Sequence, residues 1–233
     1  MERKLPEFTS RQSRAEWILA LLWLPLHLFG LPFLLLRLFP ALDAAWLNFY
    51  AYLVGAVFML GTQFCFLRRD FDPLCERFGS VLLEVIISYG AMMLFNMVVT
   101  GLLSLALETI DNPNNAQLTD LSRVNRGTVA AVAVYLAPIV EELIFRAGVF
   151  GALRHKNRVL GYVVSIALFA VYHIWGYALS DPVAWLYALQ YLPISFLLCR
   201  IYERTNTIWS SILLHMLVNT VALHALELVE RLL

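Results

Sequence analysis

The sequence predicts an all-α, polytopic transmembrane helical bundle of about seven spans. Of its 233 residues, 61% are hydrophobic and only 15% are charged, and the mean hydropathy of +0.71 does not suit a water-exposed globular surface. Seven apolar runs are long enough to cross about 30 Å of hydrocarbon, and the helix breakers gather between them. We therefore expect an integral, multi-pass protein of the cell membrane, with the lipid bilayer as its surroundings.

The chain divides into spans and connectors without a visible internal repeat or soluble domain. The predicted spans are 16–39, 44–67, 81–107, 128–153, 159–179, 182–201 and 206–229. The predicted connectors, which hold prolines, glycines and charges, are 40–43, 68–79, 108–127, 154–158, 176–182 and 202–206. We expect an N-terminal three-span region, 1–127, and a four-span core, 128–233. The net charge of zero gives no indication of a nucleic-acid partner.

The basic residues predict a cytoplasmic N-terminus. Counted along the predicted topology, twelve lie in segments on the N-terminal side of the membrane and three on the other. The twelve are Arg3, Lys4, Arg11, Arg14, Arg68, Arg69, Arg77, Arg154, Lys156, Arg158, Arg200 and Arg204, and the three are Arg123, Arg126 and Arg231. Because basic loops stay in the cytoplasm, this bias favours an N-terminus inside and a C-terminus outside.

The stretch 138–146 places two carboxylates and a guanidinium inside an apolar run, and charges at that depth usually mark function. On a helix Glu142 and Arg146 are four residues apart, so they share a face and can neutralise each other. Glu141 is rotated about 100° from Glu142 and has no local partner. A carboxylate in such a place can take a proton from water. The alternative is structural: an ion pair and a hydrogen-bonded glutamate that lock two helices.

Two later spans carry histidines that can meet Glu141. His173 follows Phe169 by one turn, and His215 precedes Asn219 by one turn. At 1.5 Å per residue from the inner helix ends, Glu141 lies about 20 Å deep, His173 about 22 Å, and His215 and Asn219 about 14 and 20 Å. These four residues can therefore lie in one layer. His27, His224 and the interfacial Glu84 lack such company, and we expect them to be structural.

The absence of other motifs narrows the chemistry. The sequence has no HExxH, no GxSxG and no aspartate within a span. What remains is a water polarised by Glu141 and His173, with His215 and Asn219 donating to the developing oxyanion. Glu141, His173 and His215 could instead form a His₂Glu zinc site. No cofactor is favoured, because an Asn–His pair suits oxyanion donation, but zinc stays open.

The three motifs Glu-Glu-x-x-x-Arg, Phe-x-x-x-His and His-x-x-x-Asn, with the turn 202–205, resemble the CPBP family of CAAX prenyl endopeptidases and bacteriocin-processing intramembrane proteases. The resemblance covers about 128–222. It implies that Glu141 is the water-activating acid, with Glu142 and Arg146 as its structural companions. It also implies that His173 is the second activating group and that His215 and Asn219 are the oxyanion donors. Ser195 and Cys199 stand where the family usually has glycines, which puts close packing there in doubt.

The predicted function is that of an intramembrane endopeptidase, glutamate-type or metalloprotease-like, cutting a peptide bond near the cytoplasmic membrane face. The resemblance implies peptide or membrane-protein substrates, such as prenylated CAAX tails or leader-bearing peptides. Within it, a bacteriocin self-immunity membrane protein is an alternative. A proton- or cation-coupled carrier is another, because buried Glu and His also form relays, although no inverted repeat supports it. Spans one to three match no motif.

Overall fold

The structure, a computed structural model, describes residues 8–107 and 112–232, in which every regular element is a helix. Seven helical segments are long and apolar enough to cross a membrane, which confirms the predicted class and span count. They are Arg14–Leu38 (α1 Arg14–Pro25, η1 Leu26–Gly30, α2 Leu31–Leu38), Ala44–Thr62 (α3), Phe78–Leu103 (α5), Pro113–Arg154, Arg158–Ala178 (α9), Pro182–Thr205 (η4 Pro182–Gln190, α10 Tyr191–Thr205) and Ile208–Ala225, the first part of α11 (Ile208–Leu232). The chain is therefore an integral, multi-pass membrane protein.

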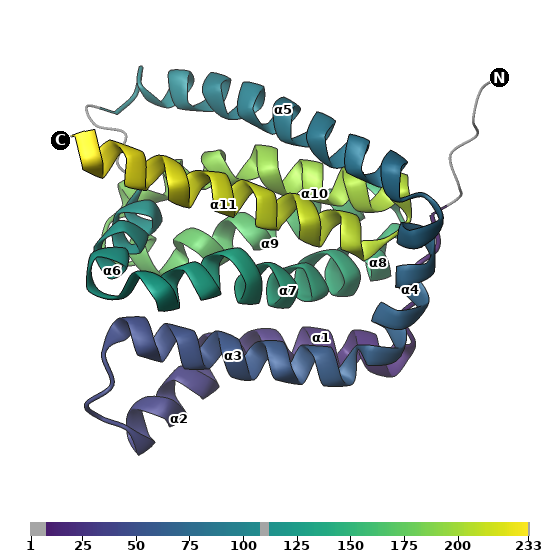
Figure 1. Ribbon diagram of the computed structural model, residues 1–233, viewed down its shortest axis with the longest axis horizontal. Helices are drawn as coiled ribbons and strands as arrows, with labels where there is room; N and C mark the ends of the chain where they lie inside the picture. Colours follow the sequence, from purple (N-terminus) through teal and green to yellow (C-terminus); the bar gives the residue numbers. More distant parts are fainter. Residues whose placement is uncertain (1–7, 108–111, 233) are drawn as a thin grey trace.

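Two of the longer expected connectors are helical instead, and 202–205 of a third belong to α10. Residues 68–79 lie largely in α4 (Phe64–Glu76), and 113–127 lie in α6 (Pro113–Ala130), while 108–111 are outside the described residues. Asn112 caps α6 by accepting a hydrogen bond from the backbone N–H of Asn114, and Pro113 occupies the first turn. These are ordinary helix-start signals, which the polarity of the segment obscures. Figure 1 shows α6 at one end of the bundle and α4 with α8 (Gly151–Arg154) at the other.

The fourth span is not a regular α-helix. After α6 it runs through a wide π-helical turn (η2, Ala131–Leu136), a short α-helix (α7, Ala137–Glu142) and a second π-helix (η3, Leu143–Phe150). Pro138 within the span has no N–H to donate, and its ring would clash with a carbonyl one regular turn earlier. The wider turn avoids that clash, and Ala137 donates to the carbonyl of Val132, five residues back. The two glutamates therefore lie between two π-helical turns, which are common at functional sites.

Small residues let the N-terminal helices approach this span closely. A Cβ added at Gly55 of α3 would lie 3.3 Å from Val140 of α7, and one at Gly148 of η3 would lie 3.4 Å from Ala20 of α1. Such small residues are the usual means by which membrane helices pack backbone to backbone. The N-terminal spans thus pack against the core, and the predicted boundary at 127/128 falls within α6. The division into two regions stays a prediction.

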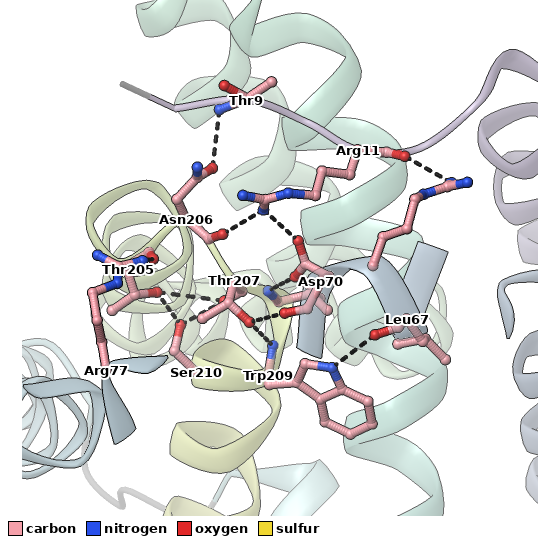
Figure 2. Close-up of polar contacts among 12 residues, drawn as sticks. Thr9, Arg11, Leu67, Asp70, Arg77, Thr205, Asn206, Thr207, Trp209 and Ser210 are labelled. Atoms are coloured by element: carbon pink, nitrogen blue, oxygen red, sulfur yellow. Dashed lines mark hydrogen bonds and ion pairs between the residues drawn. The ribbon is translucent and has the colours of Figure 1, made fainter. Parts of the chain in front are cut away.

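A polar junction fastens the turn between α10 and α11 (Figure 2). Asn206 adopts the left-handed conformation, with φ 55°, that often ends helices. Its side chain accepts from the backbone N–H of Thr9 at 2.9 Å, and its carbonyl accepts from Arg11 at 2.7 Å. Arg11 also pairs with the buried Asp70 of α4 at 2.8 Å, and Asp70 accepts from the N–H of Ile208. This junction fixes where α11, the helix of the C-terminal motif, begins.

The two ends of the bundle differ in their number of basic residues. Arg37, in the last turn of α2, lies at the α6 end, so that end holds one more basic residue than the three counted from the sequence. The bias towards the α4 end remains, and the cytoplasmic N-terminus stays a prediction from it. Glu84 pairs with Arg204 at 2.7 Å, away from the histidines, in keeping with the structural role expected for it.

Candidate active site

Glu142 is fully buried, pairs with one cation of its own span and hydrogen-bonds two side chains of α11. Its Oε1 lies 3.2 Å from Nη1 of Arg146, which confirms the predicted ion pair. The same oxygen lies 2.8 Å from Nδ1 of His215, and Oε2 accepts from the hydroxyl of Ser211. A carboxylate with this many donors is occupied as an acceptor. Glu142 therefore joins the fourth span to α11 and orients the imidazole of His215.

Arg146 has no exposed surface and is held by two further groups. Its Nη2 donates to Ser195 at 3.1 Å, and the guanidinium lies 4.1 Å from the ring centroid of Phe169. In the sequence Ser195 only put close packing in doubt, but in the structure it is a polar partner of this buried cation. Cys199, the other residue at a position where the family usually has glycine, lies 3.5 Å from the hydroxyl of Ser165. Both substitutions therefore make polar contacts inside the bundle.

Glu141 is held by one oxygen and leaves the other open. Its Oε1 accepts from the hydroxyl of Tyr52 at 2.8 Å, and that hydroxyl lies 2.7 Å from the hydroxyl of Tyr172. Because an ionised carboxylate can only accept, Tyr52 donates to Glu141 and Tyr172 donates to Tyr52. Oε2 is buried and has no hydrogen-bond partner among the described residues. It lies 3.8 Å from Nε2 of His173 and 3.9 Å from Nε2 of His215.

Tyr52 was not among the residues predicted for the site. It comes from α3, in the region where no motif was found, and reaches Glu141 because Gly55 on the same helix allows α3 to lie against α7. One signal was available in the sequence: a tyrosine hydroxyl in the middle of a membrane span needs a polar partner. That signal does not say which helix supplies the partner.

The second nitrogen of each imidazole fixes its tautomer. Nδ1 of His173 lies 2.8 Å from the carbonyl of Phe169, and Nδ1 of His215 lies 2.8 Å from Glu142. A carbonyl and a carboxylate only accept, so both Nδ1 atoms carry hydrogen, and each neutral ring presents a lone pair at Nε2. Three acceptor atoms thus face one another around Oε2 of Glu141. A group lying between them must donate hydrogens or carry positive charge.

The distances between Oε2 of Glu141 and the two Nε2 atoms can be compared with those expected around a metal ion and around a water. Two donors of a tetrahedral zinc ion lie about 3.3 Å apart, and here the carboxylate and imidazole atoms are 3.8 and 3.9 Å apart. For a water that makes hydrogen bonds of about 2.8 Å to both atoms of such a pair, the angle between the two acceptors at the water oxygen is about 87°. Each hydrogen bond then departs only modestly from linearity. Among the residues described, no group of three His, Cys, Asp or Glu side chains has the arrangement of a metal site.

The hydrogen bonds at Nδ1 of the two imidazoles are of the kind that metal-bound histidines make. A metal-bound histidine usually directs its second nitrogen to a carboxylate or carbonyl, and both His173 and His215 do so. If zinc binds, Glu141, His173 and His215 are the residues that would hold it, and it would supply a Lewis acid and an acidified water. The metal-free site stays a prediction.

The predicted site residues lie together. Glu141, His173, His215 and Asn219 all line one cavity of about 860 Å³, and Glu142 and Arg146 lie buried behind them. The amide of Asn219 donates to the carbonyl of Ala133 at 2.7 Å, which leaves its second N–H. His27 also lines the cavity, and its ring packs edge-on to Tyr52 at 4.7 Å.

Comparison with known proteins agrees with the motifs. Residues 125–221 match the family model described as type II CAAX prenyl endopeptidase Rce1-like. The expected resemblance is confirmed. The matched segment includes the whole Glu-Glu-x-x-x-Arg, Phe-x-x-x-His and His-x-x-x-Asn series. Tyr52 and His27 lie outside it.

Two curated relatives are similar over the same part. The "UPF0177 protein YxdF" of Lactococcus lactis subsp. lactis (strain IL1403) is 32% identical over 95 residues, 41% of this chain and 48% of that protein. The "Putative membrane peptidase YdiL" of Bacillus subtilis (strain 168) is 33% identical over 90 residues, 38% of this chain and 33% of that protein. The alignments thus span about half and about a third of these relatives. No solved structure matches. The family and the second name point to a membrane peptidase.

Proposed function

We propose that this protein is an intramembrane endopeptidase that hydrolyses a peptide bond with a water activated by Glu141. The observation that carries the proposal is the buried, unpartnered Oε2 of Glu141, which lies within 4 Å of two imidazole Nε2 atoms on two other helices. A water there can donate to Oε2 and to one imidazole, which orients its oxygen lone pairs towards the cavity. The match to CAAX prenyl endopeptidases supports peptide hydrolysis over other water chemistry.

In the proposed reaction, the water oxygen attacks the carbonyl carbon of the substrate while Glu141 takes one proton from the water. The carbonyl oxygen becomes an oxyanion. Asn219 donates to it with its second N–H, and His215 can donate when Nε2 also carries a proton, because Glu142 then stabilises the imidazolium at Nδ1. Glu141 returns its proton to the amide nitrogen, the C–N bond breaks, and a carboxyl and an amine product leave.

The substrate class proposed from the resemblance is a peptide or membrane protein, with prenylated CAAX tails and leader peptides as the first candidates. The test is cleavage of such peptides by the purified full chain in lipid nanodiscs, followed by mass spectrometry of the products. Glu141→Gln should abolish cleavage, because an amide cannot take the proton. Glu84→Gln, which changes an acid far from the cavity, is the matched control and should cleave normally. Cleavage retained by Glu141→Gln would refute the mechanism.

A further inference from the structure

The described lining of the cavity that holds the site extends towards one end of the bundle only. From the layer of Glu141, His173 and His215 its lining continues through the start of α3, the end of α5, the start of α6, the end of α9 and the middle of α11. No described lining residue comes from 53–91, 142–168 or 195–214, the segments that lead to the α4 end. Figure 1 shows that α6 and α4 are at opposite ends. The described lining therefore leads from Glu141 to the α6 end.

Side-chain amides line the way from that end to the site. They come from five elements: Asn48 of α3, Asn96 of α5, Asn114, Asn115 and Gln117 of α6 with its cap Asn112, Gln190 of η4, and Asn219 of α11. An amide both donates and accepts, so it can pair with the N–H and the C=O of a peptide backbone. Asn96 points to such a role, because its Oδ1 is buried and has no hydrogen-bond partner among the described residues.

The described lining of the cavity also has few ionisable side chains. Its described ionisable side chains, tyrosines aside, are Glu141 and three histidines, and it includes no lysine or arginine. A terminal carboxylate brought into this cavity would meet no fixed cation, and a charge taken out of water without an opposite charge is disfavoured. An uncharged backbone segment can instead be satisfied by the amides.

We propose that the cavity takes an extended, uncharged segment within a polypeptide, which enters from the α6 end and is held along its backbone by the amides. This rests on the proposed function for its chemistry and adds the route and the class of segment. Of the candidates named above, it favours leader peptides and internal segments over CAAX tails, which end in a carboxylate. With the N-terminus in the cytoplasm, as the basic residues predict, the α6 end faces the outer side. The cleavage near the cytoplasmic face expected from the sequence is then incompatible with that orientation.

The route can be tested without hydrolysis, in the full Glu141→Gln chain with the exposed Cys65 and Cys75 changed to serine. Single cysteines are introduced at Asn96, in the cavity, at Asn114, on its rim, and at Asn157, exposed near the α4 end. Sealed vesicles of both orientations are treated with a membrane-impermeant methanethiosulfonate. Asn96→Cys should react from the same side as Asn114→Cys and from the side opposite to Asn157→Cys. Reaction from the Asn157→Cys side, or from neither side, would overturn the route.

The class of segment is tested by protection, with Asn48→Cys as the reporter. A short peptide of uncharged residues, acetylated and amidated, should slow its modification. Adding Asn96→Leu should raise the half-protecting concentration about two- to tenfold, the effect of losing one hydrogen-bonding pair. Met97→Leu, a lipid-facing neighbour, should not.

Stronger protection by the same peptide with a free terminal carboxylate, or no effect of Asn96→Leu, would overturn the proposed recognition. Because the reporter chain carries Glu141→Gln, these results do not depend on peptide hydrolysis. A failure of the proposed function would instead appear as cleavage that survives Glu141→Gln in the nanodisc assay.

Discussion

Replacing each of the two adjacent glutamates by glutamine should give two different defects. Glu142→Gln leaves Arg146 fully buried with its counter-charge removed, while Ser195 still accepts from its Nη2. Breaking a buried ion pair by removing one partner costs about 3–5 kcal/mol. For a chain of this length, 1 kcal/mol lowers the melting temperature by about 2–4 °C, so we expect a fall of roughly 6–20 °C.

Glu141→Gln should be close to neutral for stability. The amide oxygen can still accept from Tyr52, and no cation is left unpaired, because both histidines around Oε2 are neutral in the tautomers described above. We expect a change below about 1 kcal/mol, within the range of mild substitutions, together with complete loss of cleavage.

Melting of both variants in the same detergent, followed by the nanodisc cleavage assay, measures both quantities. Equal destabilisation by the two substitutions would refute the reasoning, because it would mean that Glu141 also balances a buried charge. Normal stability of Glu142→Gln would mean that Arg146 finds another counter-charge.

Four further outcomes are expected. Tyr52→Phe removes a hydrogen bond to a charged group, about 1.5–3 kcal/mol, so kcat should fall roughly 10- to 150-fold with little change in folding; an unchanged kcat would remove Tyr52 from the site. Asp70→Asn weakens the junction before α11 and should lower the melting temperature by several degrees, whereas the exposed Asp120→Asn should not. Cysteines at Asn157 and Asn114 should label from opposite sides of the membrane, and the same side for both would mean that the topology is wrong. Exhaustive chelation should leave cleavage intact, and loss that only zinc restores would establish a metallopeptidase.

The parts of the fold and site that the sequence predicts are those encoded locally. The seven spans follow from apolar runs of sufficient length, and the Glu142–Arg146 pair follows from residues one turn apart. Depth along the helices correctly brings His173 and His215 to Glu141, because residue number converts approximately into height even along the fourth span with its π-helical turns.

What the sequence does not predict depends on contacts between distant helices. Tyr52 meets Glu141 through a close approach at Gly55, and no pattern within α3 names the helix it will face. The bond between Glu142 and His215 was missed because Glu142 was already assigned to Arg146, and a carboxylate can accept from several donors at once. The helical α4 and α6 were missed because polarity was taken to indicate connectors.

The charges gathered around Oε2 of Glu141 have a consequence for the energetics of hydrolysis inside a membrane. While both imidazoles are neutral, two carboxylates and one guanidinium leave this cluster one negative charge in excess. When a water bound there gives a proton to Glu141, the negative charge passes to the attacking oxygen and then to the oxyanion, a few ångströms away. No charge is created or separated across the low-dielectric interior, where that would be most costly. The negative charge is therefore already buried in the folded protein, and each turnover only moves it between Glu141 and the oxyanion.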